Sequence, residues 1–168
     1  MPKSDLQNSI QWFRDAAPYI HAHRGKTVVL AFDGAALLES SFPSLIEDIA
    51  LLSSLGLKLV LVHGVRPQTE QALQAVNHQT EIHKGLRITD QTTLAISKQV
   101  VGSVRVDIES LFSTNTQNTA MANSALHIAS GNYVTAQPVG VVDGIDHLHT
   151  GKVRKINAAA IQQQLDNN

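Results

Sequence analysis

The sequence contains no cysteine, few aromatic residues and no long apolar run. The absence of cysteine excludes disulfides and thiolate chemistry, and it fits the cytoplasmic location that we expect. No apolar stretch approaches the roughly 20 residues that span a bilayer. Residues 1–25 also lack the uninterrupted apolar segment of a signal peptide. We therefore expect no membrane partner.

A concentrated positive charge is missing as well. The 13 basic and 14 acidic residues give a net charge of −1, and no basic cluster exceeds residues 152–155 (Lys-Val-Arg-Lys). Because binding to nucleic acid needs a concentrated positive face, we expect no nucleic-acid partner. A hydrophobic fraction of 43% over 168 residues is enough for one domain with a core.

Residues 5–23 have the pattern of an amphipathic helix. One apolar stripe recurs at helical spacing: Leu6, Ile10, Phe13, Ala17 and Ile20. Because this helix precedes the first strand, its stripe is a candidate contact between copies of the chain. Packing of the helix back on the protein's own core is the alternative that the pattern leaves open.

Strand and helix patterns then alternate: strand 26–32, helix 44–55, strand 57–62, helix 67–76 and helix 91–112. This order predicts an α/β fold with a parallel sheet. The apolar positions expected in the helical faces are Phe42, Leu45, Ile49, Leu52, Val101, Val104, Ile108 and Leu111. After about residue 127, the turn pairs Gly131-Asn132 and Asp143-Gly144 predict an added layer of β-hairpins. Asn157 is expected to cap a last helix.

Two segments follow strands, where ligands bind in open α/β sheets. The first contains Asp33 and Gly34, preceded by Ala31. A phosphate held there would face the Asp33 carboxylate, and like charges about 4 Å apart repel by roughly 1 kcal/mol even in water. The segment is therefore a poor triphosphate site, and an ordinary strand–helix turn is the alternative.

The second segment is better equipped for an anion. His63, Gly64 and Arg66 follow the second strand, and Arg87 lies on a later loop. The two arginines could clamp an acidic ligand, or they could pair with nearby Asp or Glu side chains. His63 could act as a base or be structural. His147 and His149 alternate on an expected strand, but two histidines are too few, so we expect no metal site.

Three motifs in order resemble the amino acid kinase family, in its acetylglutamate kinase branch. Residues 24–27 (Arg-Gly-Lys-Thr) match the start of the family's first strand. Residues 63–68 (His-Gly-Val-Arg-Pro-Gln) match a His-Gly-Gly-Gly-Pro-Gln loop, and residues 85–90 (Gly-Leu-Arg-Ile-Thr-Asp) match Gly-x-Arg-Val-Thr-Asp. The resemblance implies a three-layer α/β/α fold with a mostly parallel sheet.

The departures from the kinases imply that kinase activity is lost. Ala31, Asp33 and Gly34 stand where the kinases carry a lysine and a glycine pair, and Val65 and Arg66 replace two further glycines. A relative with this kinase-like domain but without kinase chemistry is the bacterial N-acetylglutamate synthase family. The segments that resemble it are residues 12–14, 18–27, 130–133, 136–144 and 149–151.

In that family a kinase-like N-terminal domain binds arginine, and a separate domain transfers acetyl from acetyl-CoA to L-glutamate in the first step of arginine biosynthesis. No segment here resembles that acetyltransferase domain. The resemblance therefore implies a truncated, non-catalytic piece of such an enzyme, with residues 1–25 as a contact helix and residues 26–168 as the first part of the kinase-like domain. We expect no cofactor in this chain, since acetyl-CoA is the substrate of the absent domain.

The resemblance also implies L-arginine as effector and a homo-oligomer formed through the N-terminal helix. Trp12, Phe13 and Tyr19 are the candidate contacts to arginine or to a neighbouring copy, although packing in the stripe alone is the simpler interpretation of Phe13. Two other functions remain open at this point. They are an active kinase for an acylated amino acid and a purely structural assembly module.

Overall fold

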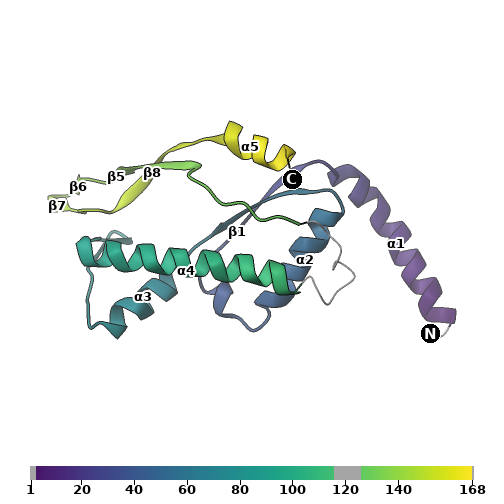
Figure 1. Ribbon diagram of the computed structural model, residues 1–168, viewed down its shortest axis with the longest axis horizontal. Coiled ribbons are helices and arrows are strands. Elements are labelled where there is room, and N and C mark those ends of the chain that lie inside the picture. Colours follow the sequence, from purple (N-terminus) through teal and green to yellow (C-terminus); the bar gives the residue numbers. More distant parts are fainter. Residues whose placement is uncertain (1–2, 116–125, 168) are drawn as a thin grey trace.

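The computed structural model describes residues 3–115 and 126–167 (Figure 1). The helices are α1 (Lys3–His23), η1 (Ala36–Leu38, a 3-10 turn), α2 (Phe42–Ser54), α3 (Arg66–Ala75), α4 (Gln91–Asn115) and α5 (Ala158–Asp166). The strands are β1 (Thr27–Phe32), β2 (Lys58–His63), β3 (Ile82–His83), β4 (Leu86–Arg87), β5 (Val134–Pro138), β6 (Val141–Val142), β7 (Ile145–Asp146) and β8 (Gly151–Ile156). No helix among these described residues is long and apolar enough to cross a membrane.

Strands β1 and β2 form a parallel pair that confirms the expected α/β class. Their register runs from Thr27 opposite Lys58 to Phe32 opposite His63. Parallel neighbours need a crossover connection, and α2 provides it. The carboxyl ends of both strands therefore lie at the same edge, so the loops that follow them are neighbours.

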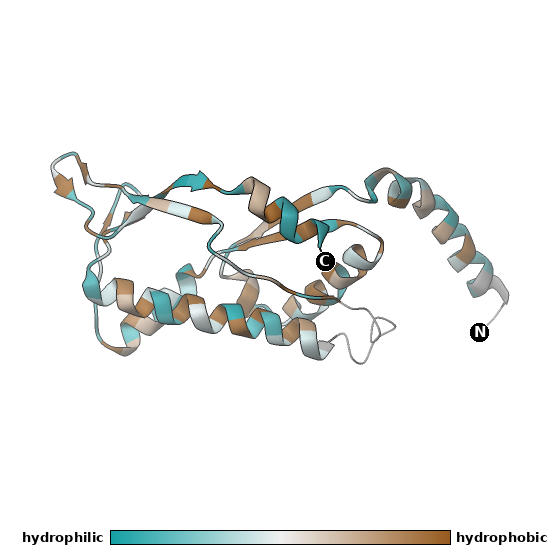
Figure 2. Ribbon diagram, turned by 45° about the horizontal axis from the view of Figure 1, so that its top comes forward, coloured by the Kyte–Doolittle hydropathy of each residue, from teal (hydrophilic) through white to brown (hydrophobic). Residues whose placement is uncertain are grey.

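One face of this strand pair packs on α2 and α4. The buried core consists of Phe42, Ile46, Ile49, Ala50, Val104, Ile108 and Phe112. The strand residues packed against it are Leu30, Phe32, Leu59 and Leu61. The opposite face of the pair carries Val29 and Val62, which are 60% and 51% exposed. Figure 2 shows hydrophobic and hydrophilic segments alternating along α4, as expected for an amphipathic helix.

Two of the expected core positions are wrong. Leu45 is 38% exposed and Val101 is 45% exposed, whereas Ile46 and Phe112 are buried on the same helices. A step of one residue turns a helix by about 100°. Since both helices carry adjacent apolar stripes, periodicity alone did not decide which stripe faces the strands.

Two hairpins have tight turns with left-handed backbone. Asp143 and Gly144 have φ of 52° and 80° between β6 and β7, which confirms the expected hairpin. Lys84 and Gly85 have φ of 50° and 77° between β3 and β4. Turns with positive φ at both central residues match the twist of the paired strands. The second hairpin has no recognisable signal in the sequence, because its strands are too short to show an alternating pattern.

The expected turn at Gly131-Asn132 is not part of a hairpin. Strand β5 pairs antiparallel with β8, with Val134 opposite Ile156 and Pro138 opposite Gly151. Residues 126–130, which directly precede Gly131, form no strand. The partner of β5 therefore comes from later in the sequence, and the β5–β8 ribbon runs with α5 along the upper side of Figure 1.

Helix α1 extends away from the rest of the molecule (Figure 1). On its apolar stripe, Ile10 is 44% exposed and Phe13 is 60% exposed. Trp12 and Tyr19 are each 71% exposed. Packing of this helix back on the protein's own core is therefore wrong, and the stripe faces solvent.

Asp90 and Asn157 cap the helices that follow them, and the cap at Asn157 confirms the prediction. Asp90 Oδ1 accepts a hydrogen bond from the Thr93 amide at 2.7 Å, and Asn157 Oδ1 accepts one from the Ala160 amide at 3.2 Å. The bond from the Thr93 amide, aided by His78 Nε2 at 2.9 Å, holds the pKa of Asp90 below its usual value of 3.8. A lowered pKa means that the ionised carboxylate stabilises the fold above that usual pKa.

We expect Asp90→Asn to lower the free energy of unfolding at about pH 7, and the difference from wild type to shrink toward about pH 3. The reason is that Asp90 itself loses its charge as the pH falls through its folded-state pKa. Urea unfolding at both pH values measures the effect. Asp107→Asn, at an exposed position of the same helix, is the matched control. A difference independent of pH would contradict the charge-based account.

Candidate functional site

The loops after β1 and β2 pack directly against each other. The Gly64 amide donates to the Phe32 carbonyl at 3.0 Å. A Cβ added to Gly64 would lie 3.1 Å from the Gly34 nitrogen, which is tighter than ordinary contacts. A side chain at Gly64 would crowd the backbone of the first loop. The close contact between the two loops therefore depends on glycine at this position.

The space over Gly34 is filled by the second loop. A Cβ added to Gly34 would lie 2.5 Å from Gln68 Oε1, 2.9 Å from Pro67 Cδ and 3.0 Å from Val65 Cα. Gln68 Nε2 also donates to the Gly34 carbonyl at 2.6 Å. A ligand would have to displace Gln68 before it could contact Gly34.

Asp33 supplies an anion to the turn from within the chain. Its Oδ1 accepts hydrogen bonds from the amides of Ala35 and Ala36 at 3.0 and 3.2 Å. Free amides at the start of a helical turn are the donors that a phosphate would use. Here they bind the protein's own carboxylate, and the exposed Ala31 on β1 contributes no charge.

Arg66 and Arg87 converge on a single carboxylate oxygen. Arg66 Nε lies 3.4 Å and Arg87 Nη2 lies 2.9 Å from Glu70 Oε1. Of the two interpretations left open above, pairing with a nearby acid describes the structure. The contact between Arg66 and Glu70 could be predicted from the sequence, because the two residues are four apart on one helix. The contact between Arg87 and Glu70 could not be predicted, because these residues lie on different elements.

His63 lies at the end of β2 against the first loop. Its ring stacks on Phe32, with ring centroids 6.3 Å apart, and its Nδ1 is 3.4 Å from the Gly64 carbonyl. Both contacts position the loop. His63 therefore shares the site with Gly34 and Gly64, and its described contacts are structural ones.

The hairpin layer is tied to the Arg87 loop. Thr150 Oγ1 donates to the Arg87 carbonyl and accepts from the Thr89 amide at 3.1 Å. The fully buried His147 places Nε2 3.2 Å from Nδ1 of His83, whereas His149 donates its amide to the Thr89 carbonyl. Within residues 3–115 and 126–167, no three histidine, cysteine or acidic side chains are placed to hold a metal ion.

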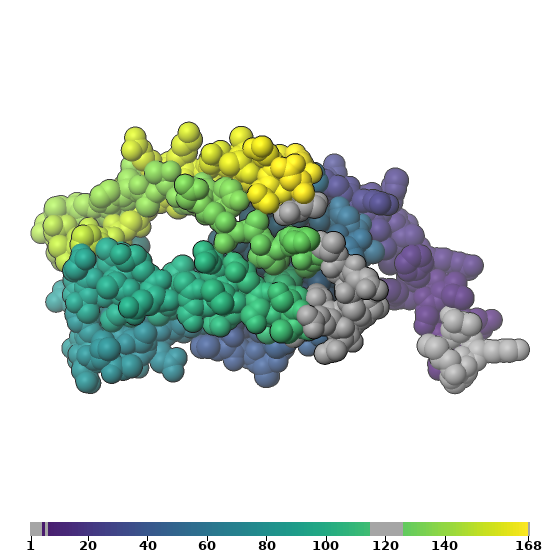
Figure 3. Space-filling view, viewed as in Figure 1, coloured from purple at the N-terminus to yellow at the C-terminus, as the bar shows by residue number. Residues whose placement is uncertain are grey.

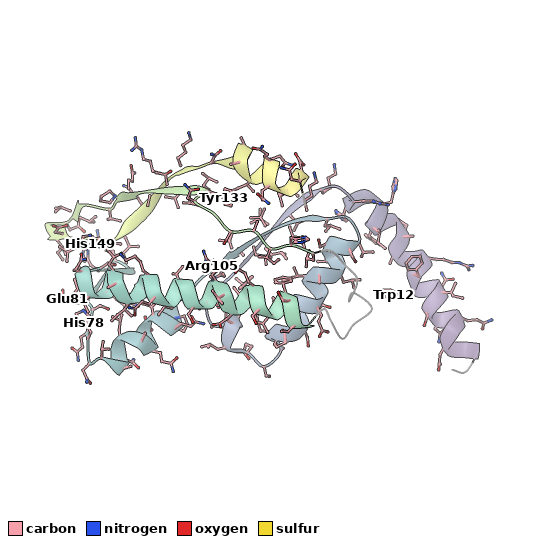
Figure 4. All side chains as sticks on the ribbon, viewed as in Figure 1. Trp12, His78, Glu81, Arg105, Tyr133 and His149 are labelled. Atoms are coloured by element: carbon pink, nitrogen blue, oxygen red, sulfur yellow. The ribbon has the colours of Figure 1, made fainter. Side chains whose placement is uncertain are left out.

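Trp12, Phe13 and Tyr19 are not brought to these loops. Helix α1 ends at His23, just before the amino end of β1, whereas the loops lie at the carboxyl end of the same strand. Figure 4 shows Trp12 on α1, well away from Arg105 and Tyr133. The candidate residues thus form two separate groups, one on α1 and one at the strand ends.

A cavity of about 300 Å³ lies between β2, α4, residues 127–133 and α5, and the sequence pattern did not predict it. Arg105 and Glu109 of α4 line it as an ion pair, with Nε and Oε1 3.6 Å apart. Tyr133 lines the cavity as well, and its ring packs on Gly131. Figure 3 shows an opening in the surface between α4 and the β5–β8 ribbon. The residues that form this cavity are too far apart in sequence to have been grouped by pattern.

The sequence profile of the amino acid kinase family matches residues 26–168. The chain is 46% identical over 157 residues to the amino-acid acetyltransferase of Aliivibrio fischeri strain MJ11, which covers 94% of this chain and 35% of that protein. It is also 46% identical over 166 residues to the amino-acid acetyltransferase of Ralstonia nicotianae, covering 99% of this chain and 37% of that protein. The chain thus spans about a third of the length of these curated relatives.

Two solved structures of N-acetylglutamate synthase from Neisseria gonorrhoeae are also similar. The complex with coenzyme A and N-acetyl-glutamate has a TM-score of 0.80 and 38% identity, over 94% of this chain and 35% of that chain. The complex with coenzyme A and L-arginine has a TM-score of 0.76 and 37% identity, over 94% of this chain and 37% of that chain. These findings confirm the resemblance on which the sequence analysis depended.

We expect Gly34→Ala to destabilise the fold by about 1–3 kcal/mol, because the new methyl group would overlap Gln68 and Val65. Thermal or urea unfolding measures the loss. Gly102→Ala is the matched control, since nothing lies within 4 Å of a Cβ at this position in α4. That control should gain about 0.5–1 kcal/mol from helix propensity. Equal stability of Gly34→Ala and wild type would show that the loops can separate.

Proposed function

The chain belongs to the amino acid kinase family, and on that basis we propose that it is the N-terminal regulatory and oligomer-forming region of an N-acetylglutamate synthase. The observation that carries this proposal is the similarity over 94% of the chain to the N-acetylglutamate synthase complexed with coenzyme A and L-arginine. In this proposal the whole enzyme transfers acetyl from acetyl-CoA to L-glutamate in the cytoplasm. Acetyl-CoA is then a substrate of another part of the enzyme, and residues 1–168 carry no catalytic group.

Loss of kinase activity is part of this proposal, and the first loop supports it. Phosphoryl transfer needs positive charge at the transferred phosphate. At this turn the amides of Ala35 and Ala36 already bind the Asp33 carboxylate, and Gln68 covers Gly34. ATP turnover with an acylated amino acid would instead support the kinase alternative.

Arginine is the effector in this proposal. An effector changes activity only if it binds two states of the protein with different affinities. An exposed aromatic ring attracts a guanidinium by about 0.5–2 kcal/mol through a cation–π contact. Trp12 and Tyr19 are exposed aromatics one above the other on α1, so they are our candidates for this contact.

Helix α1 carries two apolar stripes rather than one. The first contains Ile10, Phe13, Ala17 and Ile20, and the second contains Trp12, Ala16 and Tyr19. At about 100° per residue the two stripes are separated by roughly a third of a turn. The helix can therefore contact a neighbouring α1 with the first stripe while the second stripe borders an arginine site.

We expect Phe13→Glu to lower the molar mass of the assembly measured by light scattering, because a carboxylate in an apolar helix contact is costly to bury. Gln7→Glu adds the same charge to the polar face of α1 and is the matched control. The control should keep the wild-type mass. If Phe13→Glu also keeps it, the first stripe is not the contact between copies.

We expect Trp12→Ala to weaken arginine inhibition of the full-length enzyme by roughly 2- to 30-fold, the range that corresponds to one cation–π contact. Acetyl transfer measured against arginine concentration tests this. Gln7→Ala should leave the response unchanged, and Trp12→Phe should keep part of it. Unchanged inhibition in Trp12→Ala would remove Trp12 from the effector site.

A further inference from the structure

Two histidines join the hairpins β3–β4 and β6–β7. His83 ends β3, and His147 directly follows β7. Nδ1 of His83 lies 3.2 Å from Nε2 of His147, and the ring centroids are 5.4 Å apart. His147 is fully buried, and the side chain of His83 is 22% exposed. At this distance one ring nitrogen donates a hydrogen bond and the other accepts it.

The carboxylate of Asp143 decides which ring donates. Asp143 Oδ2 lies 4.0 Å from Nε2 of His83. A proton on this Nε2 faces a negative charge, whereas a lone pair in the same place would be repelled by it. With its proton on Nε2, the neutral His83 ring accepts at Nδ1, so His147 donates from its own Nε2. Both neutral rings therefore carry their proton on Nε2.

The charges around this contact are few. Lys84 Nζ pairs with the same Asp143 carboxylate. On the neighbouring strands, Arg87 is directed to an acidic side chain of α3, and Asp146 accepts from a backbone amide. The segment whose carbonyl receives the His147 amide, residues 138–142, contains no charged side chain. Asp143 is thus the anion that faces the histidine pair, and it is shared with Lys84.

The contact can hold one additional proton but not two. Histidine side chains take up a proton between about pH 5 and 8. A first proton can lie on His83 beside Asp143, but the proton of His147 must then move to Nδ1, which has no hydrogen-bond partner among the described residues. A second proton would place two N–H groups and two positive charges 3.2 Å apart. The ring-to-ring contact therefore breaks when both histidines are protonated.

We propose that the contact between His83 and His147 is a pH-sensitive link between the two hairpins, closed at neutral pH and open when both rings are charged. The backbone contacts of Leu148 and His149 with Thr89 contain no titrating group. They keep the base of the β6–β7 hairpin attached, so opening moves its tip away from β3. This link lies away from α1 and is independent of any arginine response there.

The test compares urea unfolding of the full chain at about pH 7.5 and about pH 5.5 in wild type and in His147→Gln. Glutamine keeps a donor and an acceptor but does not titrate. An unfolded histidine titrates near about pH 6.5, so one proton excluded from the fold raises the unfolding equilibrium constant about tenfold between these pH values. We expect the wild type to show this additional increase relative to the variant. The unfolded state binds more protons at the lower pH, so stability is lost as the pH falls.

Two further variants and one measurement on the wild type complete the design. His83→Gln, at the more exposed ring, should lose the same additional increase. His149→Gln, at an exposed position of the same segment, is the matched control and should behave as wild type. Nitrogen NMR of the wild type at about pH 7.5 should show the proton on Nε2 of both rings, and the NOE between the two rings should disappear at about pH 5.5. This measurement tests the proposal even if a variant does not fold.

Three results would overturn the proposal. They are equal pH dependence of unfolding in wild type and in the folded variants at His83 and His147, an NOE between the rings that persists when both are protonated, and a proton on Nδ1 of neutral His83. None of these measurements uses arginine, the acetyl transfer reaction or the oligomer. The histidine link can therefore fail while the proposed regulatory function holds, and the reverse is also possible.

Discussion

The close packing of the loops after β1 and β2 is the constraint on which the rest of the candidate site depends. Gly34 and Gly64 let the two backbones approach until a methyl group on either would be crowded. This approach places Gln68 of α3 over the first turn. Gln68, Pro67 and Val65 thus fill the space over Gly34.

Two carboxylates of the chain itself bind the donor groups at these loops. Asp33 binds the amides of Ala35 and Ala36, and Glu70 binds Arg66 and Arg87. Donors that would otherwise hold an external anion are thus satisfied by the chain itself. The chain belongs to the amino acid kinase family, and its own carboxylates occupy these positions. This arrangement supports the proposed regulatory role in preference to a catalytic one.

Helix α1 stands apart from that site in both position and chemistry. It leads into the amino end of β1, its apolar residues face solvent, and none of the candidate loops approaches it. Under the proposed function, an effector bound near α1 would therefore lie away from the strand-end loops, which are at the other end of β1. The candidate residues on α1 and those at the strand-end loops can therefore be tested separately.

Features that depend on a few neighbouring residues were determined by the sequence. The caps at Asp90 and Asn157, the Asp143-Gly144 turn and the order of strands and helices follow from backbone preferences and from spacings within about four residues. The resemblance to a known family was likewise readable from short motifs. Such features do not depend on contacts between residues far apart in the sequence.

Only the tertiary structure decided which distant groups meet. It showed that Glu70 receives both arginines, that β5 pairs with β8, that Ile46 and Phe112 face the core, and that α1 does not fold back. Each of these outcomes depends on the path of the chain between residues far apart in sequence, or on which of two adjacent stripes of a helix is covered. Local periodicity does not reveal these long-range contacts, because an apolar stripe or a charged residue has the same sequence pattern whichever distant residue it contacts in the folded protein.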